Sequence, residues 1–169
     1  MAKQSEGQAE RIRQRRKRAD QNLFARLPAT YAASRMQGRR FLQAAGGLSI
    51  VEWRVLWDLC EAGPMSIRDM AEIQRTDHSL LSRALPEMRK KGLVTMRRDS
   101  ADGRQMVVAV TEAGRSAYDR AAPIMQRRRA ALRAHFTPEE IETFVGLLDR
   151  LEAFLRIPVD DILKEEVAE

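Results

Sequence analysis

A short run of polar side chains between residues 76 and 83 is the part of this sequence best suited to contact another molecule. Each member can donate or accept hydrogen bonds; the set is Thr76, Asp77, His78, Ser79, Ser82 and Arg83. Apolar residues recur on the same segment at helical spacing, at Leu81, Leu85 and Met88. We therefore expect an amphipathic helix that buries its apolar side and presents the polar side outward.

Basic residues cluster at the end of this helix and after it. Residues 89–104 carry a local net charge of +4 and include Arg89, Lys90, Lys91, Arg97, Arg98 and Arg104. The whole chain has a net charge of +6, but residues 138–169 alone contribute −7, so the rest of the chain is strongly basic. Basic surfaces serve solubility, and they also bind polyanions, of which nucleic acid is the commonest.

The residue sets of enzyme chemistry are missing from the sequence. There is no glycine-rich phosphate loop and no nucleophile, base and acid combination. The only histidines are His78 and His135, whose separation does not suit a metal site, and Cys60 is the only cysteine. We expect no enzyme activity, no cofactor and no metal, and we interpret Cys60 as a small buried core residue.

Composition bounds the class of protein. Of 169 residues, 44% are hydrophobic and 32% are charged, which is typical of a chain that folds around a core. No apolar run approaches the ~18–20 residues needed to span a bilayer. No apolar segment follows the charged N-terminus, so we expect no secretory signal and a cytoplasmic protein.

Capping signals place the helices that lead to the polar run. A helix is expected over 21–45, broken or kinked early by Pro28 and ended by Gly46 and Gly47. Ser49 and Glu52 form a capping box before a second helix, which Gly63 and Pro64 stop. A short helix capped by Ser66 follows over 67–73, and the polar run then begins a helix that ends at Gly92.

The pattern changes to strands after Gly92. Residues 93–98 and 105–110 are rich in β-branched residues and flank a polar turn, so they predict a hairpin. Thr111 then caps a helix to about residue 135, and Thr137, Pro138 and Glu140 begin another to about residue 156. A short acidic helix closes the chain.

Two short helices joined by a tight turn and followed by a hairpin make a winged helix-turn-helix. In that arrangement the second helix fits the DNA major groove, which is about 12 Å wide, and the hairpin lies beside it. The expected fold class is therefore mainly α, with a two-stranded wing. We expect a basic flexible arm over 1–20, a dimerisation helix over 21–47, the DNA-binding domain over 48–112 and dimerisation helices over 113–169.

Several spaced segments lie between Leu48 and Gly114: Trp53-Arg54-Val55-Leu56, Gly63-Pro64-Met65-Ser66, Leu80-Leu81-Ser82-Arg83, Lys90-Lys91-Gly92-Leu93-Val94, Asp102-Gly103-Arg104 and Val110-Thr111-Glu112-Ala113-Gly114. In this order they resemble the multiple antibiotic resistance regulator (MarR) family. The resemblance implies a dimeric transcription regulator, usually a repressor, that binds double-stranded DNA. Many members release DNA when a small aromatic or lipophilic compound binds.

The resemblance also implies roles for individual residues. Arg83 matches an arginine that enters the major groove, Arg104 matches the wing-tip arginine of the minor groove, and Asp102 matches the acidic residue that holds it. The full set of expected DNA contacts is Thr76, His78, Ser79, Ser82, Arg83, Arg97, Arg98, Asp102 and Arg104. Expected effector contacts are Tyr31, Met36, Trp53 and Arg54, for which core packing is the alternative.

Pro86 departs from the family pattern because it lies inside the expected recognition helix. Proline removes the hydrogen bond to the Ser82 carbonyl and pushes Leu85 away from helical angles, at about 3 kcal/mol in a regular helix. We expect a bend near residues 82–86, so the sequence does not determine which bases this helix contacts. Two alternative functions remain: a regulator that does not respond to a ligand, and a protein-interaction module that has kept the fold but lost DNA binding.

The last long helix carries a broad apolar stripe that predicts self-association. Its members follow i, i+3, i+4, i+7 spacing and are Ile141, Phe144, Val145, Leu148, Leu151 and Leu155, widened by Leu147 and Phe154. A chain of this size would struggle to cover so wide a stripe alone. A homodimer would place two recognition helices about 34 Å apart on a pseudo-palindromic site.

The basic arm either contacts phosphates or is solvated.

Overall fold

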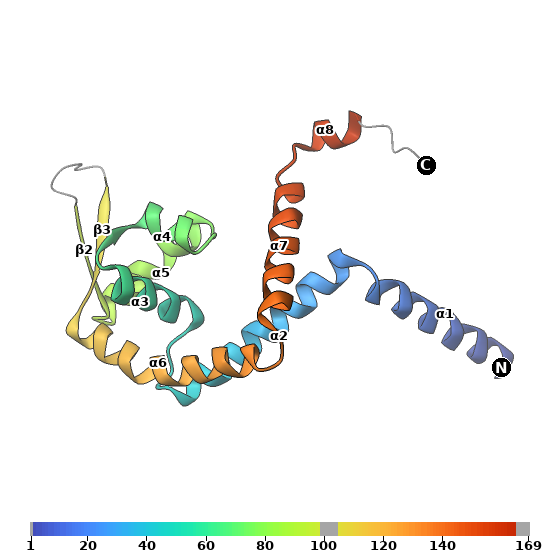
Figure 1. Cartoon of the computed structure of the whole chain (residues 1–169), viewed down its shortest axis with the longest axis horizontal. Helices are drawn as coiled ribbons and strands as arrows, with labels where there is room; N and C mark the ends of the chain where they lie inside the picture. The colour runs from blue at the N-terminus through green and yellow to red at the C-terminus, as the bar shows by residue number, and fades with distance from the viewer. Residues whose placement is uncertain (1, 99–104, 165–169) are drawn as a thin grey trace. The chain divides into compact units, whose positions relative to one another are not determined.

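The computed structural model of the protein describes residues 2–98 and 105–164, which form helices and one small sheet (Figure 1). The helices are α1 Ala2–Asp20, α2 Leu23–Ala44, α3 Ile50–Ala62, α4 Ile67–Ile73, α5 His78–Lys90, α6 Glu112–Arg133, α7 Pro138–Leu155 and α8 Val159–Lys164. The strands are β1 Met65–Ser66, β2 Val94–Arg98 and β3 Met106–Val110. The chain divides into two compact units, Met1–Met125 and Gln126–Glu169.

The predicted helix starts are confirmed. Ser49 begins α3 with a capping box in which its backbone N–H donates to Glu52 at 2.7 Å and its hydroxyl accepts from the Glu52 N–H. Ser66 with Asp69 and Thr137 with Glu140 form the same reciprocal pair at the starts of α4 and α7. Each box satisfies two of the backbone donors that a helix leaves open at its N-terminus.

Helix α2 ends where two glycines allow the chain to turn. Gly46 and Gly47 have φ of +110° and +87°, and their N–H groups donate to the carbonyls of Gln43 and Leu42. This pattern satisfies the last carbonyls of the helix. The expected break at Pro28 is wrong, because α2 continues through it. Proline removes a single bond there, to the carbonyl of exposed Phe24, where water can replace it.

Residues 2–20 form helix α1, so the expectation of an arm without regular structure is wrong for them. The segment lacks apolar periodicity, but it is rich in alanine, glutamine, glutamate, lysine and arginine, which are strong helix formers. Glu10 adds local support on the helix surface by pairing with Arg13 at 3.2 Å and accepting from Gln14 at 3.1 Å. A break at Gln21 and Asn22 separates α1 from α2, which Asn22 caps.

The sheet has three antiparallel strands in the order β1-β3-β2. The hairpin pairs Val94 with Val110 and Arg98 with Met106, as predicted for the wing. Strand β1 was not predicted: its two residues pair with Val107 and Val108 of β3. A two-residue strand carries no periodicity, so only the fold reveals it.

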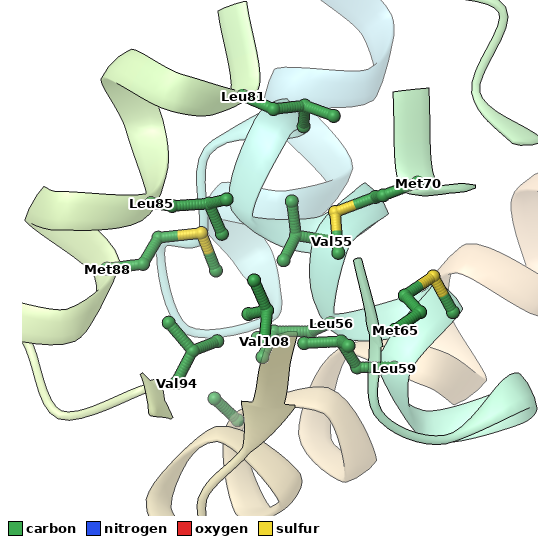
Figure 2. Packing of buried hydrophobic residues seen from close by; sticks show 11 residues of the cluster. Val55, Leu56, Leu59, Met65, Met70, Leu81, Leu85, Met88, Val94 and Val108 are labelled. Carbon is green, nitrogen blue, oxygen red and sulfur yellow. The ribbon is translucent and has the colours of Figure 1, made fainter. Parts of the chain in front are cut away.

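Two apolar clusters hold the first unit together. The larger joins α3, α4, α5 and the sheet, and Figure 2 shows its side chains converging; they include Val55, Leu56, Leu59, Met70, Leu81, Leu85, Met88, Val94 and Val108. The smaller joins α2 and α6 to α3 through Leu42, Ala45, Trp53, Ala121 and Met125. Helices α3 and α6 each contribute buried residues to both clusters, so these two helices connect the clusters.

Candidate nucleic-acid interface

Helix α5 presents its polar run on the side opposite the core. Leu81 and Leu85 are fully buried and Met88 is 1% exposed, as predicted for the apolar side. His78, Ser79, Ser82 and Arg83 are all exposed, while Thr76 lies half-buried in the turn before the helix. Since the apolar side is fixed in the larger cluster (Figure 2), the rotation of α5 about its axis is fixed, and with it the direction of the polar run.

The polar run is ordered by bonds within the helix. Asp77 caps α5 by accepting from the Ser79 N–H at 2.7 Å. That bond and the nearby charge of Arg83 hold the pKa of Asp77 below its ordinary value. His78 Nδ1 lies 3.0 Å from Ser82 Oγ, and Arg83 Nε donates to the Ser79 carbonyl at 3.2 Å. These bonds orient the side chains on one exposed surface.

Side chains of α3 hold the turn between α4 and α5 in place. Arg54 donates to the carbonyl of Gln74 at 2.6 Å, and the Gln74 side chain donates to Asp58 at 2.6 Å. Burial raises the pKa of Asp58, although the bond from Gln74 and the charge of Arg54 act against this rise. Arg75, the next residue, has a φ of +46°, which is uncommon outside glycine. The contacts of Arg54 and Asp58 therefore fix an unusual turn just before the polar run.

Pro86 lies on the exposed side of α5, and the helix runs without interruption from His78 to Lys90. The expectation that Leu85 leaves helical angles is therefore wrong. The Ser82 carbonyl that loses its partner belongs to an exposed residue and can meet water, while Leu85 and Met88 anchor the helix on both sides of the proline. The expected change of direction near residues 82–86 stays a prediction.

Arg97 and Arg98 lie at the end of β2, opposite Val107 and Met106 of β3, and both are exposed. Successive side chains on a strand point to opposite faces, so these two arginines place positive charge on both faces of the wing. The predicted wing contacts Asp102 and Arg104 lie outside the described residues.

Two of the basic residues counted with the wing have partners inside the chain. Lys91 donates to Glu52 at 2.7 Å and Lys90 to Glu87 at 2.6 Å. Burial alone would raise the pKa of Glu52, but the bonds from Lys91 and Ser49 outweigh it and lower this pKa. The Lys91–Glu52 pair ties the end of α5 to the start of α3, a role that spacing in the sequence does not signal.

The four expected effector contacts lie in different surroundings in the structure. Trp53 is 3% exposed and stacks on Tyr118 at 5.4 Å between ring centroids, so the core alternative applies to it. Tyr31 and Met36 line an open concavity along α2, whereas Arg54 lines a different one beside Trp57.

The remaining candidate groups are accounted for by packing. Cys60 is half-buried rather than fully buried, and burial raises the pKa of its thiol, which disfavours the reactive thiolate.

Among the described residues, no three histidine, cysteine or acidic side chains gather in a way that suits a metal ion. No helix in the described parts of the chain has the length and apolar character to cross a membrane.

A buried helix pair, an outward polar run and a basic two-stranded ribbon define a winged helix-turn-helix protein. Residues 48–106 match the model of the MarR family. The chain is 26% identical over 111 residues to the homoprotocatechuate degradative operon repressor of Escherichia coli, covering 66% of this chain and 75% of that protein. This part of the chain is similar to the MarR family, and the comparisons indicate a transcriptional regulator rather than an enzyme.

Solved structures agree with this fold. A MarR family regulator from Silicibacter pomeroyi has a TM-score of 0.62 and 26% identity, over 83% of this chain and 94% of that one. The M. tuberculosis regulator MOSR, solved in complex with DNA, has a TM-score of 0.68 and 19% identity, over 80% of this chain and 99% of that one.

Proposed function

We propose that this regulator binds double-stranded DNA sequence-specifically, with α5 in the major groove. The observation that supports this proposal is the polar run on α5. Its side chains are exposed and ordered by hydrogen bonds, while the opposite side of the helix is buried in the core. Its hydroxyl, imidazole and guanidinium groups are the types that read base edges. The M. tuberculosis structure pairs the same fold with DNA, which supports the assignment.

Arg97, Arg98 and Arg104 supply the wing contacts in this proposal, and Asp102 holds Arg104 in place. The exposed arginines at the end of β2 support it, because the wing would meet phosphates on either side of a groove. The alternative of an interaction module without DNA binding rested on Pro86. Since α5 remains helical through that residue, this alternative is no longer favoured.

The DNA-bound form is proposed to be a homodimer that represses transcription at a pseudo-palindromic site. Among the exposed large apolar side chains, only Ile73 and Leu80 belong to residues 48–112, and nearly all others lie in α2 and from Leu132 onward. Helix α7 has no buried residue at all. Exposed large apolar side chains at helical spacing along α7 are typical of an interface. Dimerisation would also present two copies of α5 to one duplex.

Binding should be measured with purified protein on DNA from upstream of its own gene and on random DNA of equal length, across a salt series. We expect a clear preference for the upstream DNA and a steep fall of affinity with salt, with a slope of about 0.9 per phosphate contact. Weak and equal binding to both would contradict the proposal, provided that a genomic selection with the same protein also enriches no site.

Release by a small aromatic or lipophilic compound is a separate part of the proposal. Adding a panel of phenolic and lipophilic acids to the protein–DNA complex tests it. A compound that weakens the complex at a fixed salt concentration would support an effector response. If no compound in the panel does so, the regulator acts without a ligand, which was the alternative from the sequence.

A further inference from the structure

Helix α1 has a high density of positive charge on residues that do not take part in the core. Six of the eight residues from 11 to 18 are basic and none is acidic; they are Arg11, Arg13, Arg15, Arg16, Lys17 and Arg18. Every residue from Gly7 to Arg18 is exposed. None of them belongs to either apolar cluster, and the segment lies outside the region matched by the family model.

The cations lie on all sides of α1. At 100° per residue, Arg11, Arg15 and Arg18 share one side of the helix. Arg13, Arg16 and Lys17 occupy the opposite side. A helix that lies on a membrane surface needs one continuous apolar face, and Ile12 is the only large apolar residue in this stretch. The distribution therefore disfavours a lipid surface as the partner.

This arrangement destabilises the isolated helix, because like charges at i, i+4 spacing repel each other. An anionic partner that reaches both sides of the helix would offset the repulsion. The grooves of duplex DNA have a row of phosphates along each wall. Helix α1 has 19 residues, and a helix of that length spans about 28 Å, comparable to roughly eight base pairs of duplex.

We propose that α1 is a second DNA-binding element, which contacts the phosphates of duplex DNA flanking the site read by α5. The contact is independent of sequence, because phosphates carry no base information. This inference rests on the proposed function, since it assigns a further part of the chain to the same partner.

The test compares the full-length protein with two variants. One replaces the six basic residues of α1 by glutamine, which keeps helix propensity and removes charge. The matched control replaces Arg11, Arg13, Arg15, Arg16 and Arg18 by lysine, which keeps the charge. Circular dichroism and thermal unfolding confirm that both fold. Binding is measured across a salt series on a duplex limited to the specific site and on one extended by about ten base pairs on each side.

We expect the wild type to bind the extended duplex about tenfold more tightly than the short one at ~0.1 M salt, with a salt slope steeper by at least about 2. The glutamine variant should lose this gain and keep its preference for the specific sequence. The lysine control should keep both. An equal salt slope for wild type and glutamine variant on the extended duplex would overturn the inference.

Further outcomes separate this inference from the proposed function. A wild type with no sequence preference, whose affinity still falls in the glutamine variant, would remove the role of α5 and leave that of α1. Vesicles of phosphatidylserine and phosphatidylcholine provide the third arm. If the glutamine variant loses vesicle binding while its DNA binding is unchanged, the partner of α1 is a membrane and the inference is wrong.

Discussion

At the scale of single residues, hydrogen bonds within the exposed polar run orient the side chains of the proposed interface. Arg83 is exposed, yet its Nε is tied to the Ser79 carbonyl, and Ser79 in turn bonds the cap residue Asp77. A guanidinium oriented in this way meets a base edge with less loss of rotamer freedom than an unrestrained one. Arg83 is therefore the residue at which sequence preference is best tested.

Replacing Arg83 with alanine should weaken binding to the specific site by about 1–3 kcal/mol and leave binding to random DNA nearly unchanged. The measurement is a pair of titrations at one salt concentration. Arg98→Ala is the matched control, because a wing arginine that contacts phosphates should weaken both complexes alike. Equal losses on both DNAs for Arg83→Ala would reduce Arg83 to a phosphate contact.

Gly114 shows how close packing restricts one position near the start of α6. A Cβ at this residue would lie 2.0 Å from the carbonyl oxygen of Leu93, an atom that also accepts from the Thr111 N–H. Since the obstacle is backbone rather than a flexible side chain, the wing and α6 would have to separate. We expect Gly114→Ala to lower the free energy of unfolding by about 3 kcal/mol, measured by urea denaturation.

Gly7→Ala is the control for Gly114→Ala, because no atom lies within 4 Å of a Cβ at Gly7. That substitution lies in exposed α1 and should leave global unfolding unchanged. A Gly114→Ala protein as stable as wild type would mean that the wing and α6 adjust more freely than their contact suggests.

At the scale of elements, the position of α5 depends on what holds its two ends. The turn before α5 is bonded to α3 through Arg54 and Asp58. At the C-terminal end of α5, Lys91 is bonded to Glu52 of α3. Helix α3 thus fixes both ends of α5. The sequence predicted each helix separately but not these connections.

The Glu52–Lys91 pair predicts how stability changes with acid. Because the pKa of Glu52 is lowered in the folded state, its contribution is complete above its ordinary value of 4.5 and is lost as pH falls through the lower, folded-state pKa. We expect Glu52→Gln to cost about 1 kcal/mol at pH 7 and much less at pH 3. Denaturation of both proteins across this range measures the difference.

Glu87→Gln serves as the comparison for Glu52→Gln, since Glu87 pairs with Lys90 on the exposed surface. Exposed pairs contribute little, so its profile should follow that of wild type. A constant difference between Glu52→Gln and wild type at all pH values would show that ionisation of Glu52 is not the cause.

Pro86 is the second test at the scale of elements. Pro86→Ala restores a donor opposite the Ser82 carbonyl and should stabilise the protein by about 1–3 kcal/mol. If proline bends α5, the same change should alter the preferred DNA sequence, as measured by selection from a random library. Pro28→Ala restores a bond in α2 and should leave the preferred sequence unchanged. An unaltered preference for Pro86→Ala would remove the bend from the account of recognition.

At the scale of the whole molecule, most of the exposed large apolar residues in the described part of the chain lie outside residues 48–112. Phe144 is 59% exposed and Leu148 is 40% exposed, and they are one turn apart on α7. Large apolar side chains at this spacing form a stripe that water covers poorly. A second copy of the chain is the partner that the proposed function assigns to this stripe.

The double variant Phe144→Glu, Leu148→Glu should be monomeric in sedimentation at concentrations where wild type is a dimer. It should also bind the palindromic site at least about tenfold more weakly, because two linked contacts become one. Glu142→Lys is the control; it changes charge on the same helix and should stay dimeric. A double variant that remains dimeric would place the interface elsewhere.

The sequence determined the local structure because the signals for it lie within a few residues. Helix caps at Ser49, Ser66 and Thr137 and the glycines after α2 act over three to five positions, and their predictions are confirmed. The apolar periodicity of α5 likewise predicted which side is buried. Several spaced segments that resemble one family then indicated the fold class. A set of segments in a fixed order is more specific than any one of them, because it also fixes the elements that lie between them.

Only the tertiary structure decided how distant segments meet. Glu52 and Lys91 are 39 residues apart, and Arg54 and Gln74 are 20 apart, so neither contact leaves a local pattern. The pairing of β1 with β3 and the approach of Leu93 to Gly114 are of the same kind. Packing also overrode local propensity at Pro86 and placed Trp53 in the core, because burying apolar side chains outweighs the loss of one hydrogen bond.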